Sequence, residues 1–456
     1  RHIREARACM REAQRAVPAW IMPLPRVFES LSPDVEKFDV ILVDEASQAD
    51  ITSVPLLYFG RKVIIVGDDK QVSPSAVGVP ADDVAHLMAS TIDGIVPHAS
   101  LYTMDTSLYD LAQMHYRASM LMEHFRSVPE IIEYSNQLCY DGRIRPLREA
   151  GAGAFVPLVD CHVAGEREEK GRRNAVEAEY IAALLAACIE QPEYRDATFG
   201  AISMLGDTQP KLIREIAAAH IGIAELEAHG FLSGTPAHFQ GDERDVIFLS
   251  FVDSLRPGED GTLRLVSEGY GGEQARRYNV AVSRARDQVF LVHSMDTTDL
   301  KNGDLRRSLF AYAAAGKRAE APAVREATPF EAVVARDLRK KGYTIREQYT
   351  VGSYTIDMVA CGGRSKAAIV CDGERFGLTA PAAAEERRRE AVLERLGWRF
   401  FHLRGSAYYQ DPEGAISRLS EELDALGIAR RKAGEPFEQP APKANARQEL
   451  AARVRA

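Results

Sequence analysis

The sequence of 456 residues lacks several features that would assign it quickly to a class of protein. No apolar run approaches the roughly 20 residues that a membrane-spanning helix needs, which argues against an integral membrane protein. The six cysteines are scattered without a CxxC spacing, which argues against both a zinc site and a disulfide framework. We therefore expect a soluble protein of the reducing cytoplasm, without a membrane partner.

The sequence also lacks an excess of basic residues, because 57 Lys and Arg stand against 66 Asp and Glu. The net charge of −9 gives no reason to expect nucleic acid, whose phosphates require clustered Lys and Arg. A local basic face stays open near the N-terminus, where arginines recur at helical spacing: Arg4, Arg7, Arg11 and Arg15. A solvated helix face shared with neighbouring acidic residues explains the same pattern.

Hydrophobic patterning divides the chain into several domains, as expected for a length beyond the roughly 250–300 residues of a single core. Short apolar runs at 40–43 and 63–66 are typical of buried parallel strands, and helical patterns alternate with such runs, which predicts an α/β protein. The predicted parts are an α/β domain over 1–115, a second α/β domain over 116–315, a linker over 316–328, a small α/β domain over 329–428 and a disordered tail over 429–456.

Polar residues follow both predicted strands of the first domain. Asp44 and Glu45 come directly after the first strand, and residues 67–71 (GDDKQ) follow the second. Because ligands bind at the carboxyl ends of strands in open α/β sheets, these side chains should meet in one site. One carboxylate can bind Mg²⁺ while the other orients a water, and the Gln71 amide can sense a terminal phosphate. A helix N-cap is the alternative reading of Asp44.

The DEASQ stretch at 44–48 and the GDDKQ stretch resemble motifs II and III of the superfamily 1 helicases, in their 1B branch. Three later stretches resemble motifs IV, V and VI in the family's order: residues 124–127 (HFRS), 234–243 (GTPAHFQGDE) and 279–286 (NVAVSRAR). Five motifs in order over about 245 residues are hard to obtain by chance. The resemblance implies two RecA-like domains that use ATP and Mg²⁺ to move along single-stranded DNA or RNA, and of the two DNA is the expected partner.

The resemblance also implies roles for residues of this sequence. Asp44 would hold Mg²⁺, Glu45 would activate the water, and Gln71 would take part in catalysis. Arg126 and Arg284 would be arginine fingers, which suits the planar, permanently charged guanidinium group. Further residues would bind the nucleotide or couple its state to domain closure: Asp68, Gln240, Gly241, Glu243 and Arg286.

One element of the family is missing, because no GxxxxGK[ST] loop occurs anywhere in the sequence. In the family this loop lies upstream of motif II, and its amides and Lys hold the β- and γ-phosphates. The sequence starts with Arg1 rather than Met, so we do not take this as the natural start. We expect a P-loop segment of the same parent protein upstream, and we expect ATP turnover to require it.

Residues 329–413 resemble the very-short-patch-repair-like branch of the PD-(D/E)XK nucleases. The resemblance is carried by 330–331 (FE), 354–357 (YTID), 371–373 (CDG) and 396–399 (LGWR). Such nucleases hold Mg²⁺ with acidic side chains from a helix and two strands, and here Glu331, Asp357 and Asp372 would supply them.

Val370 departs from this nuclease pattern, because relatives usually carry an acidic residue two positions before the Asp-Gly pair. A valine does not bind Mg²⁺, and Glu374 lies beyond the turn at Gly373. Nuclease activity and a fold kept for DNA binding or structure therefore both stay open. The three arginines at 387–389 would contact phosphate or form a solvated helix face.

The leading hypothesis is an enzyme, the C-terminal part of an ATP-dependent nucleic-acid helicase with an appended nuclease-like domain. A catalytically inactive DNA-binding module is the first rival. A metal-dependent nuclease regulated by an inactive motor is the second. An intact P-loop upstream in the parent protein favours the first hypothesis, and metal-dependent cutting that depends on Asp357 would favour the last.

Overall fold

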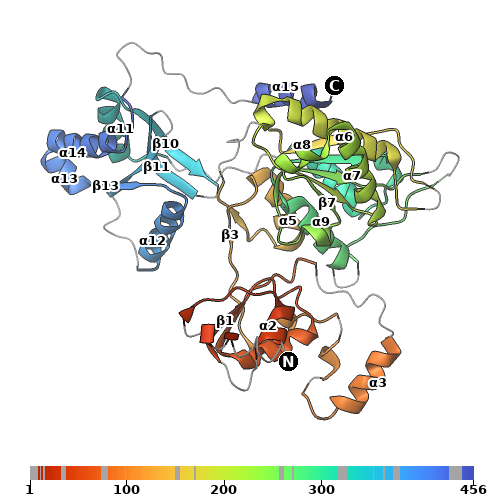
Figure 1. Ribbon diagram of the computed structural model, residues 1–456. Helices are drawn as coiled ribbons and strands as arrows, with labels where there is room; N and C mark the ends of the chain where they lie inside the picture. The colour runs from red at the N-terminus through yellow and green to blue at the C-terminus, as the bar shows by residue number, and fades with distance from the viewer. Residues whose placement is uncertain are drawn as a thin grey trace.

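The structure is a computed structural model, shown in Figure 1. The residues that it describes are 9–10, 12–13, 16–31, 37–72, 81–97, 99–103, 105–148, 155–168, 171–255, 261–269, 272–316, 326–352, 354–362, 365–372, 380–430 and 444–455. The predicted basic face at Arg4 to Arg15 lies outside the described residues, as does most of the predicted linker. Within the described part, no helix is long and apolar enough to cross a membrane.

The first domain is built on two parallel strands, β1 (Phe38–Val43) and β2 (Gly60–Ile65), both predicted from the sequence. One face of this sheet packs on a small core that includes Val43 and Phe59. The other elements are α2 (Leu24–Ser30), η1 (Ile51–Phe59), α3 (Ala81–Thr91), η2 (Ala99–Leu101) and α4 (Leu108–His115).

The opposite face of the β1–β2 sheet is apolar and exposed. Val40, Leu42 and Ile64 point to this face and keep 51%, 63% and 50% of their surface accessible. Parallel sheets are normally covered on both faces, because their strands are apolar on both. The described residues thus leave one face of this sheet without a cover.

The second domain contains a five-stranded parallel sheet in the order β5-β9-β8-β6-β7. The strands are β5 (Leu158–His162), β6 (Phe199–Ser203), β7 (Leu232–Gly234), β8 (Arg244–Ser250) and β9 (Ala285–His293). The helices are α5 (Pro129–Cys139), α6 (Ala175–Glu190), η3 (Pro192–Tyr194), α7 (Thr208–His220), α8 (Ile223–Ala228), η4 (Pro236–Phe239), α9 (Glu273–Ser283), η6 (Thr297–Asp299) and α10 (Leu305–Ala314). Alternate side chains of each strand enter different cores, because successive residues of a strand point to opposite faces.

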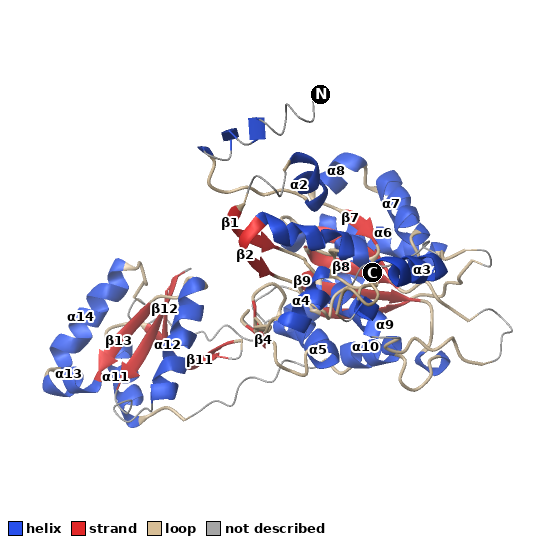
Figure 2. Cartoon of the chain, turned by 90° about the horizontal axis from the view of Figure 1, so that it is seen from below, coloured by secondary structure: helices blue, strands red, loops and turns tan. Residues whose placement is uncertain are grey.

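Helices cover both faces of this sheet, as Figure 2 shows. Val246 and Phe248 of β8 enter the core beneath α6 and α7, whereas Ile247 and Leu249 enter the core on the side of α5, α9 and α10. The alternation of strands and helices predicted for this domain is confirmed, with edge strands β5 and β7 added to the three predicted strands. Two short strands outside the sheet, β3 (Glu123–His124) and β4 (Arg145–Pro146), pair in parallel.

The C-terminal domain is a four-stranded mixed sheet, ordered β10-β11-β12-β13, between two layers of helices. Its first three strands are antiparallel, and β13 runs parallel to β12. The elements are α11 (Pro329–Lys340), β10 (Thr344–Val351), β11 (Tyr354–Gly362), β12 (Ser365–Asp372), α12 (Ala380–Arg395), β13 (Phe400–Arg404), α13 (Gly405–Gln410) and α14 (Pro412–Ala425). The three-part α/β architecture predicted from the sequence is confirmed.

The predicted disordered tail requires a correction, because residues Ala444–Arg455 form a helix, α15. It lies against α6 of the second domain (Figure 1). Leu450, Ala451 and Val454 are spaced for one helix face and are buried in the core of that domain. Arg453 adds an ion pair with Glu193 at 2.7 Å. Pro436, Pro440 and Pro442 among charged residues are typical of a disordered segment, whereas the short apolar stripe that follows them stabilises a helix.

A buried carboxylate, Glu177 of α6, joins the ends of β8 and β9. It accepts hydrogen bonds from Ser250 Oγ at 2.7 Å, from the Val252 amide at 2.8 Å and from Ser294 Oγ at 3.1 Å. Burial raises the pKa of Glu177 to about 7, although these hydrogen bonds oppose the shift. Between pH 4.5 and about 7, Glu177 therefore keeps its proton in the folded chain and loses it in the unfolded chain.

We expect the Glu177→Gln variant to be more stable than the parent at high pH. This advantage over the parent should be smaller at low pH. Folded Glu177 binds more protons than the unfolded side chain between pH 4.5 and about 7, so parent stability falls as pH rises through this window. The stability difference between variant and parent should grow by roughly 2–3 kcal/mol from pH 5 to pH 8. Urea denaturation at both pH values measures it. Glu179→Gln, on the exposed side of α6, is the control, and a pH-independent difference would contradict the prediction.

Candidate functional site

The loops that follow β1 and β2 lie side by side at one edge of the first sheet. The Ala46 amide donates to the carbonyl of Val66 at 2.8 Å, which joins the two loops. Asp44 and Glu45 stand in a turn directly after β1, and Glu45 has a φ of 50°. The N-cap alternative for Asp44 is wrong, since the next helix, η1, is capped by Asp50.

The loop after β2 is held by the Asp68 carboxylate. It accepts from the side-chain amide of Gln71 at 2.8 Å and from the hydroxyl of Tyr140, in the second domain, at 2.6 Å. Gly67 permits the close approach of the two loops, because a Cβ there would lie 3.0 Å from the Ser47 amide nitrogen. Gln71 is thereby fixed on the side of the loop that faces the second domain.

Residues of the second domain meet this loop directly. Nη2 of Arg284 donates to Oε1 of Gln71 at 3.0 Å. The Asn279 amide donates to the Lys70 carbonyl at 2.8 Å, and the Gln240 amide donates to the Val72 carbonyl at 3.2 Å. The segments around Gln71, Gln240 and Arg284, far apart in sequence, therefore meet at the boundary of the two domains.

A second cluster, centred on Glu243, borders this boundary. The Glu243 carboxylate forms ion pairs with Arg126 and Arg286, and Nε of Arg286 lies 2.9 Å from its Oε1. Burial opposes ionisation, but the hydrogen bond from Arg286 and the charge of Arg126 lower the pKa of Glu243. Arg148 donates to the carbonyls of Arg126 and Arg286 at 2.9 and 3.0 Å. The cavity here has a volume of about 730 Å³ and is lined by Glu123, His124, Phe125, Arg126, Arg148, Glu243, Asp245, Arg286 and Asp287.

The electrostatics of this region favour an anion. Burial, followed by the charges of Arg126 and Arg284, lowers the pKa of His124 to about 4. His124 is therefore neutral near pH 7, and its Nε2 accepts from the Ser127 amide at 2.9 Å. Burial and the nearby Arg126 also lower the pKa of Arg284 to about 10, while Glu45 opposes this. Guanidinium groups held together in this way are stabilised by a negatively charged ligand.

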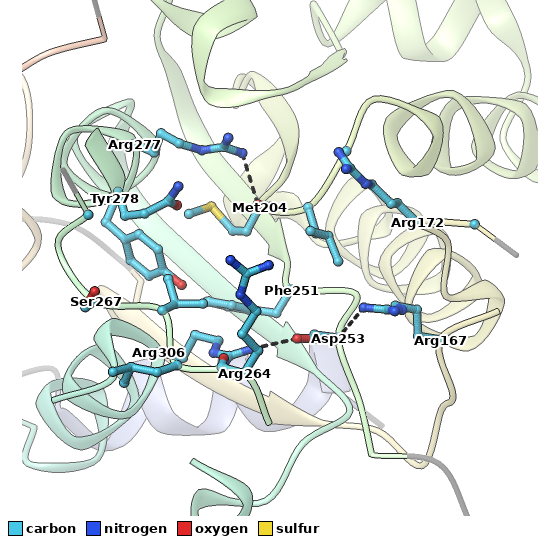
Figure 3. A pocket seen from close by; sticks show the side chains of 17 residues that line it. Arg167, Arg172, Met204, Phe251, Asp253, Arg264, Ser267, Arg277, Tyr278 and Arg306 are labelled. Carbon is cyan, nitrogen blue, oxygen red and sulfur yellow. Dashed lines mark hydrogen bonds and ion pairs between the residues drawn. The ribbon is translucent and has the colours of Figure 1, made fainter. Parts of the chain in front are cut away.

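Another cavity, of about 630 Å³, opens at the carboxyl ends of β6 and β8 (Figure 3). Among the described residues, its lining includes five arginines, Arg167, Arg172, Arg264, Arg277 and Arg306, and a single acidic residue, Asp253. Asp253 lies between Arg167 and Arg306, at 2.8 and 2.9 Å, and Nη2 of Arg277 donates to the Met204 carbonyl at 3.1 Å. The rings of Phe251 and Tyr278 complete the wall. The lining is therefore basic and partly aromatic.

In the C-terminal domain the three predicted acidic residues differ in the partners that can be described for each. Glu331 belongs to the capping box of α11 and accepts from Gln348 at 3.2 Å. Asp357 accepts from the Cys371 amide at 3.4 Å, just beyond the point where β11 and β12 cease to pair, and Asp372 lies 3.3 Å from Nδ1 of His402. No three His, Cys, Asp or Glu side chains gather as a metal site among the described residues.

Comparison with known proteins assigns these parts to families. An AAA domain model matches residues 26–77, a second AAA domain model matches 104–296, and the model REase_MTES_1575 matches 330–423. The chain is 27% identical to the probable helicase MAGATAMA 3 of Arabidopsis thaliana over 60% of its length, and 26% identical to the helicase sen1 of Schizosaccharomyces pombe over 62%. It is 23% identical over 56% of its length to the human DNA replication ATP-dependent helicase/nuclease DNA2.

These matches support a superfamily 1 helicase fused to a restriction-endonuclease-like domain. The chain carries this domain in addition to the superfamily 1 core. It covers only 32%, 16% and 24% of the lengths of the three relatives, in the order given above. We call its first two domains the first and second motor domains, and the third the nuclease-like domain.

The superfamily 1 core brings most of the predicted site residues together. Gln71 and Arg284 are in contact, Asp68 holds Gln71, and Glu45 lies within electrostatic range of Arg284. Arg126, Glu243 and Arg286 form one cluster, and Gly241 occupies the turn before β8 with a φ of 84°. The roles of these residues, and of Asp44, remain predictions.

Sequence reasoning did not single out three residues of this site. The Tyr140 hydroxyl donates to Asp68, and the Asn279 amide donates to the Lys70 carbonyl and to Tyr140. Arg148 donates to the carbonyls of Arg126 and Arg286. Asn279 lies in the stretch that resembles motif VI, but the resemblance predicted no role for it. Tyr140 and Arg148 lie outside the motifs, so no pattern in the sequence marked them.

Proposed function

We propose that the chain is the C-terminal part of an ATP-dependent nucleic-acid helicase or translocase. Nucleotide would bind at the boundary of the motor domains, between the loop of Gln71 and the arginines of the second motor domain. The contact between Gln71 and Arg284 carries this proposal, because it brings a phosphate-sensing amide and an arginine finger from two domains into one place.

The residues at the boundary fit an ATP phosphate group. Nε of Arg284 is buried without a hydrogen-bond partner, and so is Oδ1 of Asn279. Buried polar atoms without partners are costly, and a phosphate oxygen would satisfy the Arg284 donor. Asp44 at the end of β1 offers the oxygen ligand that Mg²⁺ prefers. When bound, Mg²⁺ and ATP would supply the metal and the phosphoryl group that is transferred.

Each residue of this site would have a separate task. Asp44 would hold the metal, and Glu45 would orient the attacking water and accept its proton. Arg126 and Arg284 would stabilise the charge of the transferring phosphoryl group. Gln71 would sense the departure of this group and transmit the change to the second motor domain. Gln240 and Glu243 would couple this change to the relative position of the two motor domains.

The uncovered face of the β1–β2 sheet supports the expectation of an upstream P-loop segment. Val40, Leu42 and Ile64 form an exposed apolar surface that a further element of the same domain would bury. We propose that this element belongs to the parent protein and that ATP turnover requires it.

The basic cavity at the carboxyl ends of β6 and β8 is our candidate for the nucleic-acid contact. The exposed Arg172 and Arg264 and the half-buried Arg277 can bind backbone phosphates. The human relative is named a DNA replication helicase/nuclease, which favours DNA over RNA. No disulfide joins cysteines of the described residues, which is in keeping with a reducing compartment such as the cytoplasm.

For the nuclease-like domain we propose a PD-(D/E)XK type of fold, with Glu331, Asp357 and Asp372 as its acidic residues. The described residues do not fit a Mg²⁺ site, because no three acidic groups gather there and Val370 is fully buried. We therefore derive no cleavage step for this domain.

The proposed function is tested by ATP hydrolysis with and without single-stranded DNA, in this chain and in a chain extended upstream to the P-loop. We expect only the extended chain to hydrolyse ATP, with stimulation by DNA. Glu45→Gln should lower its turnover by about 10²–10⁴, the usual contribution of a positioned base. Asp39→Asn, an exposed change on β1, is the control. If neither chain hydrolyses ATP while both bind DNA, the inactive binding module replaces this proposal.

A further inference from the structure

The nuclease-like domain shares its core with the second motor domain. Leu147, which follows β4, is 2% exposed. Its neighbours in the core all come from the nuclease-like domain: Val351, Tyr354, Ile356, Val359, Ala368, Val392, Leu393 and Trp398. Burial of a leucine side chain is favourable, because it removes apolar surface from water. The two domains are therefore joined by apolar packing as well as by their linker.

The hairpin between β10 and β11 makes the closest approach. Gly352 has a φ of 56°, and a Cβ on it would lie 1.7 Å from the Pro146 carbonyl oxygen. The obstacle is backbone on both sides, which no side-chain rotation relieves. Only glycine permits this contact.

Polar contacts surround the shared core. Nη1 of Arg145 lies 3.5 Å from the Tyr354 hydroxyl and 3.5 Å from the Glu385 carboxylate. Arg388 of α12 lies 3.5 Å from Glu123 of β3. Both strands of the small β3–β4 sheet therefore contact the nuclease-like domain, and one of the arginines predicted to contact phosphate or solvent serves this contact.

The same two strands lead directly into the candidate nucleotide site. We define the β3–β4 arm as residues 123–126 and 145–148. Its first half ends in Arg126, and its second half ends in Arg148, whose guanidinium binds the carbonyls of Arg126 and Arg286. Leu147 and Arg148 are adjacent in sequence. Leu147 points into the core of the nuclease-like domain, and Arg148 points into the candidate nucleotide site.

We propose that the nuclease-like domain docks on the β3–β4 arm and fixes the position of its arginine finger, so that this domain regulates the motor. The regulatory meaning rests on the proposed function, whereas the docking and the ordering of the arm do not. Because coupling between sites is reciprocal, nucleotide that binds Arg126 would also strengthen the docking. Arg126 is the point at which docking and nucleotide state would meet.

Gly352→Ala tests the proposal without touching either core or the site. Gly397→Ala is the matched control, because Gly397 also has a positive φ, 89°, and a Cβ there meets nothing within 4 Å. Leu147→Asp disrupts the same contact from the motor side and guards against misfolding of the hairpin. Hydrogen exchange of the arm and small-angle X-ray scattering are measured on the full chain without nucleotide.

In Gly352→Ala and Leu147→Asp we expect a larger radius of gyration and amide exchange about tenfold or more faster over the arm. Gly397→Ala should match the parent in both. Undocking without faster exchange in the arm would overturn the proposal, and so would unchanged scattering and exchange in both disrupting variants. Neither readout uses ATP, so a failure of the proposed function would appear separately, as absent hydrolysis in the extended chain.

Discussion

Replacing Arg306 with leucine is expected to lower the free energy of unfolding of the second motor domain by about 3–5 kcal/mol. Arg306 is almost fully buried and binds Asp304 at 2.8 Å, Asp253 at 2.9 Å and the Arg264 carbonyl at 2.7 Å. Burial opposes ionisation of Asp304, but its hydrogen bonds with Arg306 keep its pKa below the ordinary value. The variant would leave that carboxylate buried and charged without its partner.

Native-state hydrogen exchange of the β8 and β9 amides measures this loss in the domain concerned. Arg307→Leu is the control, since Arg307 is the exposed neighbour of Arg306 on α10. Surface changes of this kind usually stay within about 0.5 kcal/mol. A loss below about 1 kcal/mol for Arg306→Leu would show that Arg167 compensates at Asp253 and that Asp304 takes up a proton.

Arg284→Ala is expected to reduce ATP turnover of the upstream-extended chain by about 10³ or more, in the range that arginine fingers supply. Arg284 is 2% exposed, touches Gln71, and carries a buried Nε without a partner. Alanine removes both the charge and the donors that would face the phosphoryl group. Steady-state hydrolysis at saturating single-stranded DNA measures the change.

A separate measurement of nucleotide affinity distinguishes chemistry from folding for this variant. We expect affinity to change much less than turnover, because an arginine finger acts mainly on the transition state. Arg214→Ala, on the exposed side of α7, should behave like the parent. Equal losses of affinity and turnover would contradict the assignment of Arg284 as a finger.

The motor domains were predictable because their signals are local. Apolar runs at 40–43 and 63–66 became β1 and β2, and the polar residues that follow them lie at one sheet edge, as parallel pairing requires. The order of the motifs then placed Arg126 and Arg284 on the domain opposite Gln71. Contact between Gln71 and Arg284 follows from the fold, but its geometry needed the structure.

Other features were beyond the reach of the sequence because they depend on distant partners. Leu147 has no periodic neighbours, and its burial comes from residues about 200 positions later. The five arginines of the basic cavity are dispersed from 167 to 306, so no charge cluster marks them in a chain of net charge −9. Glu331 was predicted as a metal ligand, and the structure adds a capping box with Thr328 that the sequence pattern did not indicate.

The packing of α15 on α6 changes how the chain can be dissected. The polypeptide leaves the second motor domain after α10, builds the nuclease-like domain, and returns to the motor core. In this path the nuclease-like domain is an insertion rather than an appendage. A truncation at the linker would remove α15 from the core of the second motor domain together with the nuclease-like domain. Any resulting defect would then be attributed to the loss of the nuclease-like domain, although the loss of α15 could cause it. An internal deletion between residues 316 and 444, bridged by a flexible linker, removes the insertion and keeps α15 in the chain.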